Sequence, residues 1–348
     1  MTTLSAQPIR AALVGYGMAG GLIHSPLMRE AGWQVTAVVT NNTERRAQVG
    51  EDWPKARTVG QLRDLLKYRD DFDVVVVVSP SHLHAEHVHT LIGAGIPTIV
   101  DKPLAVSAAE ATQLVDHASQ ENVPLTVFQN RRWDSEQLTL TQLLTTGELG
   151  QVHTFERRWE RWRPQPKNRW KENDPASGGL LQDLGAHLVD SAVHLFGPVT
   201  TVYATARNLS TAAYDDVFIS LTHASGVISR LWAGSMVGAP GPRTRVLGTK
   251  GAYVVTDFES ELTAFAVRGT SEGGAQGWVV HGESVTAVPA AKGGHGDFYR
   301  LADTWLRGEG PAPVDPRDAV TTAQILDAAQ ESALNAQVVQ PAQSNPDM

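Results

Sequence analysis

Three ionisable side chains have the types and the neighbours that proton transfer at an organic substrate requires. Asp183 and His187 are four residues apart in an apolar segment, behind a Gly-Gly pair at 178–179. A carboxylate one helical turn from an imidazole can orient the ring and stabilise its charged form. Lys102, in the run Asp-Lys-Pro at 101–103, could donate a proton or a hydrogen bond to a carbonyl oxygen. The residues alone leave plainer roles open: a helix-capping Asp, a core His and a surface Lys.

A glycine-rich hexapeptide near the N-terminus could bind phosphate. It follows the apolar run 9–14 and opens a helix-like segment, which is the context that gives such a motif its meaning. The first glycine permits a tight turn, the second lets backbone approach a pyrophosphate, and the third allows close helix–strand packing. We expect a dinucleotide here rather than S-adenosylmethionine or a turn with no ligand. The residues of the predicted phosphate turn are Gly15, Tyr16, Gly17, Met18, Ala19 and Gly20.

The end of the second apolar run indicates which dinucleotide is bound. NAD sites usually place an acid there to hold the ribose hydroxyls, whereas this chain has Thr40 and Asn41, followed by arginines at 45 and 46. A guanidinium is the natural partner of a 2′-phosphate. Thr40, Asn41 and Arg45 therefore predict NADP in preference to NAD. Two alternatives remain: the arginines could lie on a solvated helix face, and Glu44 could serve as the NAD acid.

Strand-like and helix-like patterns alternate up to residue 130 and would position these groups. Val74 to Val78 is pure valine, as expected for a parallel strand covered on both faces. The alternation predicts βαβ units and a doubly wound parallel sheet, which binds ligands beyond the carboxyl ends of its strands. The predicted strands are 9–14, 35–39, 73–79, 98–100 and 123–128, and the predicted helices include 61–68, 82–94 and 107–121.

The pattern changes after residue 130 and predicts a second, α+β domain with a mainly antiparallel open sheet. Residues 180–196 are predicted to form one helix, which would place Asp183 and His187 on one face. An extended segment is expected at 151–162, a strand-rich region from 200, and further helices at 135–146, 297–306 and 318–337. The predicted divisions are a nucleotide-binding domain at 1–130, a substrate domain at 131–339 and a frayed tail at 340–348.

Composition excludes several classes of protein. The chain has 348 residues, no cysteine and a formal net charge of −8. Lack of cysteine excludes disulfides and thiolate metal sites, and the acidic balance argues against nucleic acid or an anionic membrane as partner. A local basic pocket for a small anion remains compatible with this charge. With no long apolar run, we expect a cytoplasmic protein without membrane contact.

Taken together, these motifs resemble the Gfo/Idh/MocA family, the glucose–fructose oxidoreductase and inositol dehydrogenase group. The matching segments extend over nearly the whole chain, and their combination is far more specific than any one of them. The family's usual Glu-Lys-Pro is Asp-Lys-Pro here, which keeps the charge. The run at 128–134 resembles a subgroup that contains NADP-dependent scyllo-inositol dehydrogenases. The motifs are GYGMAG at 15–20, SPSHLH at 79–84, DKP at 101–103 and the Gly-Gly…Asp-x-x-x-His run at 178–187.

The resemblance implies roles for residues that spacing alone does not assign. Lys102, Asp183 and His187 would form the catalytic group, and no metal is expected. The open sheet of the second domain often makes subunit contacts in the family, so a homodimer or homotetramer is expected. Ser79, Pro80 and His84 would line the nicotinamide side, together with Lys102. Arg132, Trp133, Asp134 and Arg161 would face the substrate, with Arg157 and Trp159 on the same strand face as Arg161.

The expected activity is hydride transfer between a nicotinamide and a secondary hydroxyl or ketone of a sugar or cyclitol. The substrate would thus be a small polyol or sugar. Three alternatives stay open: a glycosidase that uses tightly held NAD for transient oxidation, a non-catalytic dinucleotide sensor, and a metal-dependent enzyme built on the Asp183–His187 segment.

Overall fold

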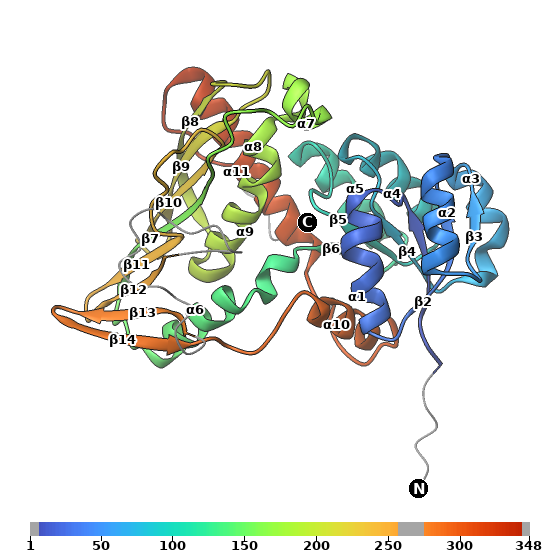
Figure 1. The fold of residues 1–348 in the computed structure, drawn as a ribbon, viewed down its shortest axis with the longest axis horizontal. Helices are drawn as coiled ribbons and strands as arrows, with labels where there is room; N and C mark the ends of the chain where they lie inside the picture. Colours follow the sequence, from blue (N-terminus) through green and yellow to red (C-terminus); the bar gives the residue numbers. More distant parts are fainter. Residues whose placement is uncertain (1–6, 257–274, 343–348) are drawn as a thin grey trace, which may run out of the picture. The chain divides into compact units, whose positions relative to one another are not determined.

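The computed structural model describes residues 7–256 and 275–342, and its contacts divide the chain into two compact units. The first unit comprises residues 1–130 and 295–320, and the second comprises 131–294 and 321–348. Each unit has its own sheet (Figure 1). Among the described residues, no helix is long and apolar enough to cross a membrane.

The first unit is built on a six-stranded parallel sheet with the order β3-β2-β1-β4-β5-β6. The order reverses between β1 and β4, which is where open α/β sheets bind ligands. The four valines of β4 are fully buried, because helices cover both faces of a central parallel strand. This confirms the predicted doubly wound sheet. The strands are β1 (Arg10–Val14), β2 (Gln34–Val39), β3 (Arg57–Val59), β4 (Val74–Val77), β5 (Thr98–Asp101) and β6 (Leu125–Phe128).

One helix of this unit comes from far along the chain. The sequence assigned residues 295–320 to the second domain, but α10 packs against α1 (Figure 1). Its Phe298 and Tyr299 are fully buried, and Tyr299 lies edge-on to Trp33 at 5.0 Å between ring centroids. The helices are α1 (Ser25–Glu30), preceded by a π-helical turn (Gly20–His24), α2 (Thr43–Asp52), α3 (Leu62–Leu65), α4 (His84–Gly93), α5 (Ala108–Gln120) and α10 (Gly296–Leu306).

The second unit is built on an eight-stranded sheet with the order β14-β13-β12-β11-β7-β10-β9-β8. Neighbouring strands are antiparallel except for β7 and β10, so the predicted mainly antiparallel sheet is confirmed. The strands are β7 (Val152–Glu160), β8 (Val199–Arg207), β9 (Asp216–His223), β10 (Ile228–Gly234), β11 (Thr244–Gly248), β12 (Ala252–Val255), β13 (Ala275–His281) and β14 (Ser284–Pro289).

Helices of the second unit cover one face of this sheet and form its core (Figure 1). The predicted single helix at 180–196 is wrong: it is divided at Leu184 into α8 and α9. Gly185 weakens helix formation at this point, and Leu326 of α11 packs 3.2 Å from where a Cβ on that glycine would lie. The helices are α6 (Ser135–Thr146), α7 (Trp170–Asn173), α8 (Gly179–Asp183), α9 (Gly185–Phe196) and α11 (Pro316–Asn335), whose first five residues belong to the first unit.

Candidate functional site

The glycine turn has the geometry of a phosphate-binding loop. Gly15 has a φ of +106°, and a Cβ there would lie 2.8 Å from the Val78 carbonyl oxygen. A Cβ on Gly20 would lie 2.7 Å from the carbonyl oxygen of Gly15, so the third glycine permits the close return of the helix. A Cβ on Gly17, in contrast, would meet nothing closer than 3.7 Å. Backbone at this position is therefore open to a ligand, and the turn fits a dinucleotide pyrophosphate.

The atoms that do lie nearest to Gly17 belong to the guanidinium of Arg45, 3.7 Å from the Cβ position. This placement depends on the start of α2, where Asn42 caps the helix by accepting a hydrogen bond from the Arg45 N–H at 2.9 Å. Arg46 makes a different contact: its Nε–H donates to the Thr40 carbonyl oxygen at 3.0 Å. The sequence could not separate these two arginines, and the structure puts one of them at the turn.

Two side chains of the turn differ in exposure. The Tyr16 hydroxyl is buried and donates to Asp52 at 2.8 Å, and burial raises the pKa of this phenol to about 12. Tyr16 thus ties the glycine turn to Asp52 at the end of α2. Met18 is 70% exposed. At the end of β2, Thr40 is buried and Asn41 holds its Oδ1 against Gly60, 2.7 Å from the Cβ position there.

His84 joins the two loops that follow β4 and β5. Its Nε2 lies 2.8 Å from the Ser79 carbonyl oxygen and its Nδ1 lies 2.7 Å from that of Pro103. The ring is buried, so this residue fixes the carboxyl-end loops by side-chain bonds to backbone. Ser79 also places its Oγ 3.0 Å from Nδ1 of His87, while Pro80 is exposed.

Lys102 directly follows β5 at the same carboxyl edge as the glycine turn. Its backbone N–H donates to Asp101 at 2.8 Å, and the peptide bond to Pro103 is cis. Asp101 in turn lies 3.8 Å from Nε2 of the buried His24. Burial acts to raise the pKa of Asp101. The hydrogen bond with His24 and the charges of His24 and Lys102 outweigh this effect and hold the pKa below its ordinary value. The strand end that carries Lys102 is therefore tied into the core.

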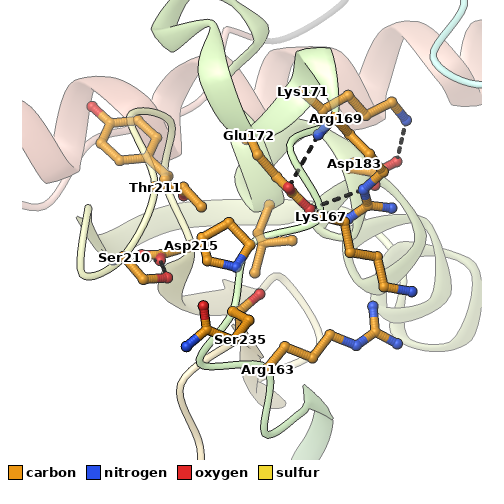
Figure 2. A pocket seen from close by; sticks show the side chains of 15 residues that line it. Arg163, Lys167, Arg169, Lys171, Glu172, Asp183, Ser210, Thr211, Asp215 and Ser235 are labelled. Carbon is orange, nitrogen blue, oxygen red and sulfur yellow. Dashed lines mark hydrogen bonds and ion pairs between the residues drawn. The ribbon is translucent and has the colours of Figure 1, made fainter.

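In the second unit, Asp183 lines a small pocket that is open to solvent. Its Oδ1 accepts a bond from Lys171 Nζ at 2.7 Å (Figure 2). The next residue of α7, Glu172, pairs with Arg169 at 2.7 Å. Gly179 allows the backbone to pass close to Tyr214 in the wall of the pocket. Its φ is +53°, and a Cβ there would lie 2.2 Å from the Tyr214 carbonyl oxygen.

His187 belongs to α9, in the turn after the break at Leu184. Its N–H bonds to the Leu184 carbonyl at 3.1 Å. Its ring stacks on Trp159 of β7, with centroids 5.7 Å apart and 29° between planes. Trp159 also carries the guanidinium of Arg161 at 5.2 Å from its centroid. The stack on Trp159 is one of the contacts that hold the imidazole.

The residues after Asn130 are held by ion pairs. Arg132 makes a bidentate pair with Asp190 of α9, at 2.6 and 3.0 Å, and both side chains are nearly buried. Asp134 lies 3.3 Å from Arg131, and Trp133 ends the 3₁₀ turn between them. Arg132 and Asp134 thus stabilise the start of the second unit, and their contact with a substrate stays a prediction.

A buried polar cluster lies beneath Trp159. Glu136 of α6 pairs with Arg157 at 3.2 Å and with Arg243 at 3.4 Å, and accepts a hydrogen bond from Thr244. Burial acts to raise the pKa of Glu136, but the two guanidinium charges outweigh it and hold the pKa below its usual value. The sequence placed Arg157 on the same strand face as Arg161. In the structure its guanidinium is paired within this buried cluster. Arg243 extends from the cluster to Trp159, 4.9 Å from the ring centroid.

The sequence analysis did not identify the basic residues between β7 and α8 that line the same pocket as Asp183. Lys171 is the residue that pairs with the carboxylate, and Arg163 and Lys167 line the same pocket. No periodic pattern marked them, because the loop between β7 and α8 is mostly irregular. Within the described ranges, His, Asp and Glu side chains form no group of three that could hold a metal.

Comparisons with known proteins agree with this architecture. A family model described as the NAD-binding Rossmann fold of an oxidoreductase family matches residues 9–129, and the model of that family's C-terminal alpha/beta domain matches 141–340. The scyllo-inositol 2-dehydrogenase (NADP(+)) IolW of Bacillus subtilis (strain 168) is 29% identical over 342 residues, 93% of this chain and 94% of that protein.

Two further relatives extend over the same length. The uncharacterized oxidoreductase YdgJ of Escherichia coli (strain K12) is 30% identical, covering 93% of this chain and 96% of that protein. The solved structure of yvaA from Bacillus subtilis has a TM-score of 0.84 at 28% identity and covers 97% of this chain and 99% of that one. The glycine turn, the two sheets and both family models lead to one conclusion: the chain belongs to the Gfo/Idh/MocA family of oxidoreductases, with an NAD-binding Rossmann fold as its first unit.

Proposed function

We propose that the protein transfers hydride between NADP and a carbon that bears a secondary hydroxyl or ketone, in a sugar or cyclitol. The observation that carries the cofactor choice is the Arg45 guanidinium, which lies beside Gly17 just after the end of β2. NAD sites usually place an acid at that strand end, whereas an arginine there can pair with the 2′-phosphate of NADP. The relative IolW is named as an NADP(+)-dependent scyllo-inositol 2-dehydrogenase, which supports the same substrate class.

The nicotinamide, when bound, supplies the redox chemistry, and the protein supplies orientation and proton transfer. In the oxidation direction His187 takes the proton from the substrate hydroxyl as hydride leaves the carbon. Lys102 hydrogen-bonds the same oxygen and stabilises its developing negative charge. In the reduction direction His187 returns the proton to the carbonyl oxygen, while Lys102 hydrogen-bonds the same oxygen.

Positioning follows from the contacts of these residues. Stacking on Trp159 limits rotation of the His187 ring, and Asp101 fixes the backbone of Lys102. Asp183, paired with Lys171, remains an acceptor for substrate hydroxyls. The proposed assembly is a homodimer or homotetramer in the cytoplasm.

The test is absorbance at 340 nm with inositols, aldoses and keto-sugars, each assayed with NADP and NAD in parallel. We expect turnover of a polyol or sugar with a higher kcat/KM for NADP. Release of a sugar from a glycoside without net change in cofactor would instead identify the glycosidase alternative. Cofactor binding without turnover on any of these compounds would favour a sensor.

A further inference from the structure

Both ring nitrogens of His84 face carbonyl oxygens. Nε2 lies 2.8 Å from the Ser79 oxygen and Nδ1 lies 2.7 Å from the Pro103 oxygen, both within hydrogen-bond distance. A carbonyl oxygen only accepts hydrogen bonds, so each nitrogen must donate one. A neutral imidazole has one N–H and would leave a lone pair against the other oxygen, whereas an imidazolium has two and satisfies both. The geometry therefore favours the charged form of this ring.

The surroundings of the ring can support that charge. His84 is 2% exposed, and a buried charge is costly unless hydrogen bonds and an opposite charge offset the lost hydration. The two bonds to carbonyl oxygens are then charge-assisted, and the carboxylate of Asp101 supplies the opposite charge. Burial acts to raise the pKa of Asp101, but His24, Lys102 and His84 together hold this pKa below its ordinary value.

A second histidine of α4 is neutral beside it. Burial lowers the pKa of His87, Glu86 acts to raise it, and the positive charge of His84 lowers it further. Of these two histidines, His84 is therefore the one that carries the charge. The ionisable groups of the elements that meet His84 also include Asp101 and Lys102 at the end of β5.

The order of the strands places this charge at one end of the cofactor site. Along the sheet, Arg45 follows β2, the glycine turn follows β1, and Ser79 and Lys102 follow β4 and β5. In sheets of this kind the adenosine ribose is held after β2 and the pyrophosphate at the turn after β1. The backbone N of Ser79 lies 3.1 Å from the Cβ position of Gly15, so the loop after β4 adjoins the turn. The nicotinamide half is then expected beyond β4 and β5, the two strands whose loops His84 joins.

We propose that His84 keeps a positive charge beside the bound nicotinamide and thereby makes the protein prefer NADPH to NADP⁺. The nicotinamide ring is cationic in the oxidised form and neutral in the reduced form, so a buried cation repels only the oxidised ring. At equal concentrations of the two forms, the protein is then loaded mainly with NADPH, the form that reduces a ketone. The inference rests on the proposed function for the use of this cofactor, and adds the redox state that the site selects.

The charge of His84 is measured directly in the cofactor-free protein. The full-length chain is labelled with ¹⁵N-histidine, and the ring-nitrogen spectra of the wild type and His84→Gln are compared at neutral pH, so that the missing signals identify His84. An imidazolium has two protonated nitrogens with similar shifts, whereas a neutral ring has one protonated and one unprotonated nitrogen. We expect the first pattern. The second pattern would overturn the proposal.

Cofactor binding shows whether this charge selects the redox state. Kd for NADPH and for NADP⁺ is measured by calorimetry, without substrate, for the wild type and each variant. The wild type should bind NADPH about tenfold or more tightly than NADP⁺, and His84→Gln should reduce that ratio about tenfold, because one nearby charge is lost. His84→Lys restores a cation and should keep most of the ratio. His89→Gln, at an exposed ring of the same helix, is the matched control and should leave the ratio unchanged.

The outcomes separate this proposal from the proposed function. If His84→Gln weakens binding of both forms alike, His84 is only a crosslink between the loops, and the charge effect is wrong. A ratio that depends on His84, without turnover of any sugar or cyclitol, supports the charge effect and contradicts the proposed hydride transfer. Turnover by a wild type that binds both forms equally leaves the hydride transfer intact and overturns the redox preference. If the protein binds neither form, both proposals fail.

Discussion

The two candidate ligand-binding regions of this protein are made in different ways. The edge of the first sheet is formed largely by backbone: a glycine turn, strand ends and carbonyl groups held by His84. The pocket of the second unit is formed by charged side chains from segments far apart in sequence, around Asp183, Arg163 and Ser210. Only the first depends on a contiguous motif.

This difference sets what each region tolerates. A site formed by backbone requires glycine at particular positions. A Cβ there would fill space needed by the ligand or by a neighbouring strand, and other residues rarely adopt a positive φ. A side-chain site can be rebuilt by changing charges, so it is the region in which substrate class can vary within one fold.

The largest effects should come from the two proposed catalytic groups, one in each unit. Lys102→Ala and His187→Ala should each lower kcat by about 10²–10⁴-fold, because proton transfer and charge stabilisation at the substrate oxygen are lost. The measurement is steady-state kinetics on the best substrate, with circular dichroism to confirm folding. Near-wild-type rates in both variants would contradict the catalytic roles proposed for Lys102 and His187.

A stability test compares the buried cluster of the second unit with its surface. Glu136→Gln should lower the free energy of unfolding by roughly 3–5 kcal/mol, since two buried guanidinium groups lose their counter-charge. Glu148→Gln, at an exposed pair with His281, should change it by less than about 1 kcal/mol. Denaturant unfolding measures both, and equal losses would contradict the importance of burial.

The same cluster predicts a pH dependence. The pKa of Glu136 is lowered in the folded protein, so its stabilising contribution is present above its ordinary value of 4.5 and is lost as pH falls toward the folded value. We expect the wild type to lose stability over that acid range more steeply than Glu136→Gln. Parallel curves of unfolding free energy against pH would show that another carboxyl group is responsible.

Two glycines of one turn should behave differently. Gly15→Ala should destabilise the first unit by about 1–3 kcal/mol, because the φ is strained for alanine and the Val78 carbonyl is too close. Gly17→Ala should leave the thermal midpoint nearly unchanged and weaken NADPH binding, measured by fluorescence titration. Equal stability losses would mean that the second glycine is needed for folding rather than for ligand approach.

Cofactor choice should depend on one of two adjacent arginines. Arg45→Ala should raise Kd for NADP by about 10- to 100-fold and change Kd for NAD little, as expected for loss of a charge-assisted bond to a phosphate. Arg46→Ala removes a bond to the Thr40 carbonyl and should affect both nucleotides alike. Arg63→Ala, on the exposed side of α3, is the unaffected control. A uniform effect of Arg45→Ala would assign it to general support of the turn.

The smallest effect concerns the residue that sequence reasoning missed. Lys171→Gln should lower kcat/KM by up to about fivefold, since partly exposed ion pairs contribute at most about 1 kcal/mol. Lys171→Arg should restore most of the loss. A loss above about a hundredfold, beyond what such a pair can supply, would show that Lys171 contacts the substrate itself.

The sequence by itself determined the parts of the protein that local rules govern. Strand–helix alternation predicted the parallel sheet, and the glycine spacing predicted the turn at 15–20, because hydrophobic period and backbone freedom are properties of neighbouring residues. The position of Lys102 after a strand was readable for the same reason.

Only the tertiary structure decided which groups meet across long distances in sequence. It packed α10 into the first unit through Phe298 and Tyr299, divided the predicted helix at Leu184 where Leu326 approaches Gly185, and paired Asp183 with Lys171. These contacts join segments that have no common period, so no pattern along the chain predicts them. Packing and charge pairing select among alternatives that local propensity leaves equal.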